Sequence, residues 1–264
     1  AKVTRDRLMV ENADCLGPVP GIGNFRHTTS IGHFRFLKNL GYRDEFTRTY
    51  GQGGTLFSDL LLGHGFVLAS RSMEGMECVL SREGLYLYRL PGARWGLVVP
   101  QGALGLRLDG NADVFSNLNA LHAALCPSAE GPLYEAVTVR TEMSGPFYRA
   151  DIPEYPGAVY GFPQTDTTEL RVNGCAVPVM AEAQKTSGGT SRTYNGVLEL
   201  KRAAVAGETV VEGRMLRTVE TPLLAAAART PEQDVPVLGK EQDKYGMEAK
   251  GSGGHVEVAL NAGE

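Results

Sequence analysis

The first half of the chain mixes the hydrophobic spacing of helices with that of strands. Apolar residues recur every three or four positions in residues 30–40 and again in residues 113–125, which is the period of an amphipathic helix. Gly41 follows the first segment as a stop and Asp113 precedes the second as a cap, so both predict helices. Asp59–Leu62 is followed by a glycine and predicts a short helix. Short apolar runs predict strands at Phe66–Ser70, Leu85–Arg89 and Trp95–Val99.

After Pro132 the pattern changes to short strand-like runs that are separated by turn residues. Asn173-Gly174 lies between two such runs and predicts a hairpin, because a type I′ turn needs a positive φ at both central positions. Thr221 and Pro222 predict the start of a helix over Leu223–Arg229. The strand-like runs are Val137–Thr141, Phe147–Ile152, Ala158–Phe162, Glu169–Val172, Cys175–Val179, Val197–Arg202 and Thr209–Leu216, followed by a hairpin of Tyr245–Lys250 and His255–Leu260.

These patterns together predict an α+β fold with two parts. Residues 1–135 are expected to form a mixed α/β domain. Residues 136–264 are expected to form an antiparallel β-sandwich, jelly-roll-like, with one inserted helix. The chain of 264 residues is long enough for one large domain or two smaller ones, so its length permits this division.

Composition narrows the classes of function. The chain has 26 basic and 30 acidic residues and no dense basic block, which disfavours nucleic-acid binding as its main role. A hydrophobic fraction of 42% excludes a disordered chain. No apolar run in the sequence reaches the ~18–20 residues that cross a bilayer. The four cysteines lie far apart without a CxxC pair, so zinc-ribbon and thioredoxin-type motifs are excluded.

The sequence lacks the short motifs that carry common enzymatic chemistry. It contains no phosphate-binding loop with Gly-Lys-Ser/Thr, no HExxH and no GxSxG. It also has no Asp-x-Asp pair of the kind that clamps a metal ion and a sugar nucleotide. Gly21-Ile22-Gly23 lacks the third glycine of a dinucleotide fingerprint and predicts a plain turn. We therefore expect no catalytic residue, no metal site and no cofactor in this chain.

Four residues are candidates for contact with a glycan. A pyranose ring stacks on an aromatic side chain, and the donors and acceptors of amides and carboxylates suit sugar hydroxyls. Trp95 is the single tryptophan and follows a turn, Asn117 and Asn119 lie at the start of a predicted helix, and Asp59 lies at another helix start. The alternative is that Trp95 belongs to the core and that the polar residues satisfy backbone N–H groups.

The order of several short segments carries a resemblance to a known family. A Gly-Asn-Phe turn is followed by the segments Phe36–Tyr42 (FLKNLGY), Gly53–Leu68 (GGTLFSDLLLGHGFVL), Leu85–Ala93 (LYLYRLPGA), Trp95–Val99 (WGLVV), Val114–Leu121 (VFSNLNAL) and Pro132–Glu135 (PLYE). This order resembles the extracytoplasmic part of the YfhO-like bacterial membrane proteins, which have the architecture of type C glycosyltransferases. The match covers the first 135 residues and extends loosely over the strand-rich remainder. Phe66 stands where the family usually has a tyrosine.

The resemblance implies a function outside the membrane. Family members are implicated in adding sugars from a lipid-linked donor to cell-envelope polymers such as teichoic acid, with the catalytic residues in the membrane portion. This chain would then be a non-catalytic domain on the extracytoplasmic face of the cell membrane. Its partners would be its own transmembrane region and a wall glycopolymer or lipid-linked sugar, and nucleic acid is not expected. The alternative is a free-standing carbohydrate-binding or cell-wall glycan hydrolase module.

Overall fold

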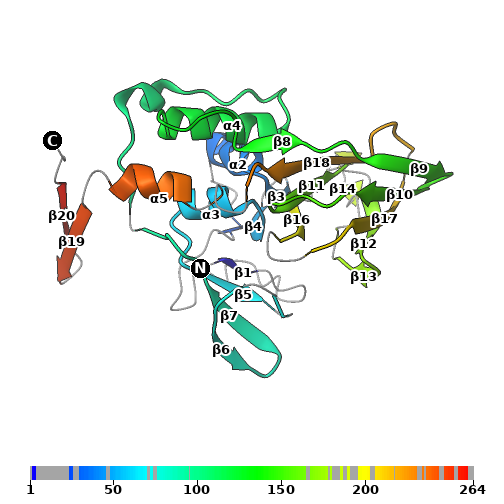
Figure 1. Ribbon diagram of the computed structural model, residues 1–264, viewed down its shortest axis with the longest axis horizontal. Helices are drawn as coiled ribbons and strands as arrows, with labels where there is room; N and C mark the ends of the chain where they lie inside the picture. Colours follow the sequence, from blue (N-terminus) through cyan, green and yellow to red (C-terminus); the bar gives the residue numbers. More distant parts are fainter. Residues whose placement is uncertain are drawn as a thin grey trace.

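The computed structural model describes most of the chain. It describes residues 2–3, 24–25, 30–45, 48–69, 72–73, 76–94, 96–164, 167–177, 179, 185–186, 189–190, 196–202, 206–216, 218–230, 234, 236–243, 247–252 and 255–260. The helices within these ranges are α2 (Ile31–Asn39), α3 (Leu56–Leu61), η1 (Gln101–Gly105), α4 (Val114–Leu125) and α5 (Pro236–Asp243). In Figure 1, α2, α3 and α4 lie toward the left of the view and most of the longer strands toward the right.

Two antiparallel sheets form a β-sandwich, which confirms the predicted α+β class. The first sheet contains, in spatial order, β13 (Cys175–Ala176), β12 (Thr167–Val172), β17 (Thr209–Met215), β10 (Phe147–Ile152) and β9 (Arg140–Ser144). The second contains β16 (Leu198–Lys201), β11 (Val159–Pro163), β18 (Leu223–Ala228) and β8 (Tyr134–Ala136). Alternate residues of both sheets meet in one buried core, including Ala150, Val211, Val159 and Ala225. This alternation places one face of each sheet against the other.

The remaining strands form smaller sheets. One sheet contains β1 (Lys2–Val3), β5 (Phe66–Ala69), β7 (Leu85–Arg89) and β6 (Cys78–Arg82), and another contains β2 (Asn24–Phe25), β4 (Arg48–Gly53) and β3 (Tyr42–Glu45). The pairs β14 (Lys185–Thr186) with β15 (Gly189–Thr190) and β19 (Met247–Ser252) with β20 (His255–Leu260) are two-stranded. The hairpin of β6 and β7 projects from the bottom of the view in Figure 1.

The second sandwich sheet is buried on both of its faces. Its inner face contributes Val159 and Ala227 to the core between the two sheets. Its other face contributes Tyr160 and Ala226 to a second core, which also contains Leu118 of α4. The layers are therefore helices, then one sheet, then the other sheet. The helical core draws residues from both sides of position 135, so the two predicted domains share part of their interior.

The predicted helix over Leu223–Arg229 is wrong, because this segment is the strand β18. Five of its six residues are fully buried, and four of those five are alanines. Alanine favours helices by intrinsic propensity, but that preference is a fraction of a kcal/mol per residue. A strand between two cores must be apolar on both faces. The small methyl groups of alanine let the helical layer and the first sandwich sheet approach this strand closely. Tertiary packing decides this segment.

Two other predicted strands also differ from the structure. Residues 96–100, which cover the described part of the predicted strand Trp95–Val99, form no strand. The predicted strand Val137–Thr141 lies across a change of sheet, since β8 ends at Ala136 in one sheet and β9 begins at Arg140 in the other. The helix within the second part is α5, thirteen residues after the predicted start at Leu223.

Local signals in the sequence are confirmed where they are strongest. Asp113 caps α4, because its Oδ1 accepts hydrogen bonds from the backbone N–H groups of Phe115 and Ser116 at 2.9 and 3.0 Å. The Asn173-Gly174 turn joins β12 to β13, with φ values of 48° and 76° at its two residues. Both features need only the residues beside them, so the sequence alone identifies them.

Candidate functional site

Asp59 lies in a buried polar cluster on α3. Thr55 and Ser58 form a capping box that starts this helix. The carboxylate of Asp59 lies between Tyr42, the first residue of β3, and His64 in the loop after α3. The hydroxyl of Tyr42 donates to Asp59 Oδ1 at 2.6 Å, and His64 Nδ1 lies 3.3 Å from the same oxygen. Burial and the nearby carboxylate raise the pKa of the Tyr42 hydroxyl well above its usual value.

The side-chain amides of Asn117 and Asn119 each form two hydrogen bonds with the backbone of one other residue. Asn117 Oδ1 accepts from the Asp109 N–H at 3.0 Å and its Nδ2 donates to the Asp109 carbonyl at 2.9 Å. Asn119 holds Tyr134 in the same way, with both distances at 2.8 Å. Tyr134 begins β8, an edge strand, so the amide of Asn119 covers backbone groups that no neighbouring strand pairs. The amide donors and acceptors that we predict to contact sugar hydroxyls are therefore engaged with backbone groups in the structure.

A third amide repeats this arrangement at Val98. Gln242 of α5 accepts from the Val98 N–H at 2.7 Å and donates to the Val98 carbonyl at 2.8 Å. Arg94 forms an ion pair with Asp243 of the same helix. The irregular segment 96–100 is therefore held against α5. Trp95 itself lies outside the described residues.

Replacing Asn119 with alanine is expected to lower the free energy of unfolding by about 2 kcal/mol, because it removes both partners of the Tyr134 backbone groups. Urea denaturation followed by circular dichroism measures the change. Asn111→Ala is the matched control, since Asn111 is exposed in the loop before α4. Equal stabilities of the two variants would contradict the structural role of Asn119.

A buried carboxylate lies between two tyrosines from the sandwich sheet. Asp234 accepts a hydrogen bond from the Tyr134 hydroxyl at 2.8 Å on one oxygen and from the Tyr160 hydroxyl at 2.9 Å on the other. Tyr134 also contacts Thr55 Oγ1 at 2.8 Å, which links the carboxylate to the cap of α3. Burial raises the pKa of Asp234 to about 6, although the two tyrosine hydroxyls oppose that shift. This cluster connects the start of α3 to the second sandwich sheet through hydrogen bonds.

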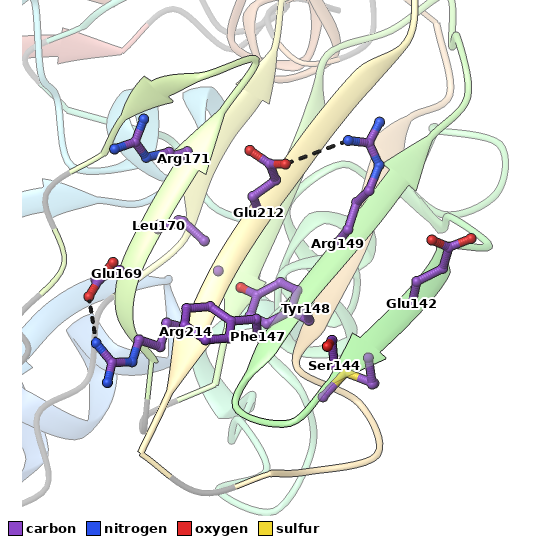
Figure 2. Close-up of a pocket in the computed structure, with 12 residues that line it drawn as sticks. Glu142, Ser144, Phe147, Tyr148, Arg149, Glu169, Leu170, Arg171, Glu212 and Arg214 are labelled. Carbon is purple, nitrogen blue, oxygen red and sulfur yellow. Dashed lines mark hydrogen bonds and ion pairs between the residues drawn. The ribbon is translucent and has the colours of Figure 1, made fainter.

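The structure also shows an open groove on the outer face of the first sandwich sheet. Its volume is about 470 Å³. The strands β9, β10, β17 and β12 supply its lining, and Figure 2 shows their charged side chains side by side on the sheet. The lining of the groove includes Glu142, Phe147, Arg149, Glu169, Arg171, Glu212 and Arg214.

Phe147 is the exposed aromatic residue of this groove. The phenylalanine side chain remains 51% exposed although it is large and apolar. The guanidinium carbon of Arg214 lies 5.5 Å from the centre of its ring, which is the distance of a cation–π contact. The next residue, Tyr148, points to the inner face, where its ring occupies the space that a Cβ at Gly213 would need. Gly213 therefore lets the tyrosine pack flat beneath the sheet.

Ion pairs across the strands order the charged side chains of the groove. Arg149 Nη1 lies 3.5 Å from Glu212 Oε1, and Arg214 Nη1 lies 3.1 Å from Glu169 Oε1. Figure 2 draws both pairs as dashed lines across neighbouring strands. Such exposed pairs add little stability, of about 0.5 kcal/mol each. The pair of Arg214 and Glu169 places a planar donor and a carboxylate acceptor beside the ring of Phe147.

The sequence contains a signal for this groove that is separate from the four candidate glycan-binding residues. The predicted strands Phe147–Ile152 and Thr209–Leu216 alternate between apolar and charged residues. Since neighbouring side chains of a strand point to opposite faces, the charged positions must share the outer face. A phenylalanine at one of these outward positions marks an exposed ring. Which charges pair across strands depends on register, which the sequence does not give.

The described residues contain no group of three or more side chains suited to hold a metal ion. Within the described part of the chain, no helix is both long enough and apolar enough to span a bilayer. The ligand-binding roles of Trp95, Asn117, Asn119 and Asp59 stay predictions, as does the resemblance to the YfhO-like family. No family model, no curated protein and no solved structure matches the chain.

Proposed function

We propose that this chain is a non-catalytic extracytoplasmic domain of a polytopic bacterial membrane protein. The whole protein would be a glycosyltransferase that modifies a cell-envelope glycopolymer from a lipid-linked sugar. The domain's role is to bind the polymer beside the membrane and so to position the acceptor. The observation that supports this proposal is the groove with an exposed ring on the outer face of the sandwich.

The chemistry of the groove suits a sugar chain. A pyranose ring has an apolar face of C–H groups, which stacks on an exposed aromatic ring such as that of Phe147. Its hydroxyls both donate and accept, so they need carboxylate acceptors and guanidinium donors within reach of one another. Glu169 and Arg214 provide such a pair at 3.1 Å beside the ring. The groove is open and extends over four strands, as binding along a polymer requires.

The Phe147→Ala variant is expected to lose about 10-fold in affinity for wall polysaccharide, because the stacking contact is removed. Isothermal titration of the purified chain with solubilised wall polysaccharide measures this loss. Since the ring is half exposed, the variant should keep its fold and its thermal midpoint.

Leu216→Ala serves as the matched control. Leu216 is 62% exposed, follows the end of β17, and does not line the groove. This variant should bind like the unaltered chain. Unaltered chain that binds no wall polysaccharide, or equal losses in both variants, would contradict the proposed function.

A further inference from the structure

We infer that the groove binds uncharged saccharide units and discriminates against the phosphate groups of an anionic wall polymer. This inference rests on the proposed function, because it names the ligand class of the same site. It goes further in stating which part of a glycopolymer the domain contacts. The observations that carry it are the charge balance of the groove and the way its charges are paired.

The charged side chains that line the groove balance one another. Three are acidic and three are basic, so the lining has no net charge. They are Glu142, Glu169 and Glu212 against Arg149, Arg171 and Arg214. A surface that binds along a chain of phosphate groups has an excess of basic residues, which neutralise several phosphates at once. The groove does not offer that excess.

Two of the three arginines already face carboxylates. Arg149 lies within 3.1 Å of Asp151 and within 3.5 Å of Glu212, so its guanidinium lies between two acids. Arg214 pairs with Glu169 at 3.1 Å. A phosphate that approaches either arginine meets the paired carboxylate at short range and is repelled by it. If the phosphate displaced the carboxylate, one ion pair would replace another, and the number of ion pairs would not increase.

The same ion pairs can bind a sugar hydroxyl without this repulsion. A guanidinium has five N–H donors and a carboxylate accepts about four hydrogen bonds, so one ion pair leaves most of this capacity open. A hydroxyl next to Glu169 and Arg214 can donate to the carboxylate and accept from the guanidinium at once. Neither charge then loses its partner. The paired arrangement therefore favours neutral groups that carry both a donor and an acceptor.

Arg171 is the residue of the groove through which a phosphate group could bind. Its side chain is exposed on β12, and it forms no ion pair within the described part of the chain. Phosphate binding through this arginine would show as salt-sensitive affinity for an anionic polymer. The test therefore compares uncharged and phosphate-bearing probes on one protein.

The experiment titrates the full chain with two kinds of probe. The uncharged probes are hexasaccharides of glucose, mannose, galactose, rhamnose and N-acetylglucosamine, and the anionic probe is polyglycerol phosphate of similar length. We expect at least one hexasaccharide to bind about 10-fold more tightly than polyglycerol phosphate. Its affinity should change less than about twofold between 50 and 500 mM NaCl, because screening acts on charged ligands.

The Glu169→Gln variant gives an opposite sign for the two ligand classes. It removes a strong acceptor, so saccharide affinity should fall about 5-fold, while freeing Arg214 should strengthen binding of polyglycerol phosphate. Glu83→Gln is the matched control, since Glu83 is an exposed carboxylate that pairs with Arg82 at the β6–β7 turn. The control should leave both affinities unchanged.

The outcomes separate this inference from the proposed function. Salt-sensitive binding of polyglycerol phosphate alone overturns the inference and leaves a glycopolymer-binding domain. Binding of none of the probes by the unaltered chain overturns the proposed function as well. Binding of an uncharged hexasaccharide that Glu169→Gln weakens supports both.

Discussion

Replacing Leu118 with alanine is expected to lower the free energy of unfolding by about 3 kcal/mol, the cost of a cavity in a closed core. Leu118 is 0% exposed and lies on α4 within the core that α4 shares with β11 and β18. Because that core also holds Tyr160 and Ala226 of the sandwich sheet, the sandwich should be destabilised together with the helices. Guanidinium denaturation followed by circular dichroism measures the loss.

A second probe, in the core between the two sheets, tests whether the two cores unfold cooperatively. The NMR signals of Ala150 in β10 report on the core between the two sheets. We expect them to disappear in the same transition as the helical signal. Leu104→Ala is the control, since Leu104 is 75% exposed on η1, and it should change stability by less than about 0.5 kcal/mol. An unchanged transition of Ala150 in the Leu118 variant would show two independent domains divided near residue 135.

The stability contributed by Asp234 should increase as the pH falls. Burial raises the pKa of Asp234 to about 6 in the folded chain, against an ordinary value of 3.8. Between these values the folded chain binds more protons than the unfolded chain, so the contribution is complete below the lower pKa and is lost as the pH rises through about 6. The full difference corresponds to about 3 kcal/mol.

Comparison with Asp234→Asn isolates this effect from other acidic groups. Asparagine keeps a similar shape between Tyr134 and Tyr160 but has no proton to gain. Relative to this variant, the unaltered chain should gain about 2 kcal/mol from pH 8 to pH 4. Urea denaturation at each pH provides the measurement, and Glu208→Gln, at an exposed carboxylate, should show no such gain. A constant difference between the unaltered chain and Asp234→Asn would mean that Asp234 is solvated.

The sequence predicts those elements whose signals lie within a few residues. The cap at Asp113 and the turn at Asn173-Gly174 are set by local hydrogen bonds and backbone angles, and both are confirmed. The strand β18 could not be predicted in the same way. Its alanines favour a helix in isolation, and they become a strand because residues far away in the sequence cover both faces.

The candidate site shows the same limit at the level of single side chains. The sequence predicts Asn117 and Asn119 as sugar ligands because an amide pairs a donor with an acceptor. In the structure a backbone N–H and carbonyl use that same pair, and the sequence cannot distinguish these partners. The outward position of Phe147 follows from alternation along β10, whereas the pairing of Glu169 with Arg214 depends on which strands become neighbours.

The alanine strand β18 limits how the sequence of this fold can change over evolution. Its four alanines place only methyl groups in the two cores that the strand separates. A larger residue at Ala226 would need a compensating loss of volume in the core shared with the helices, and one at Ala225 would need it between the sheets. Residues 225–228 should therefore vary in step with large residues across both cores, so that two otherwise separate sets of positions evolve as one.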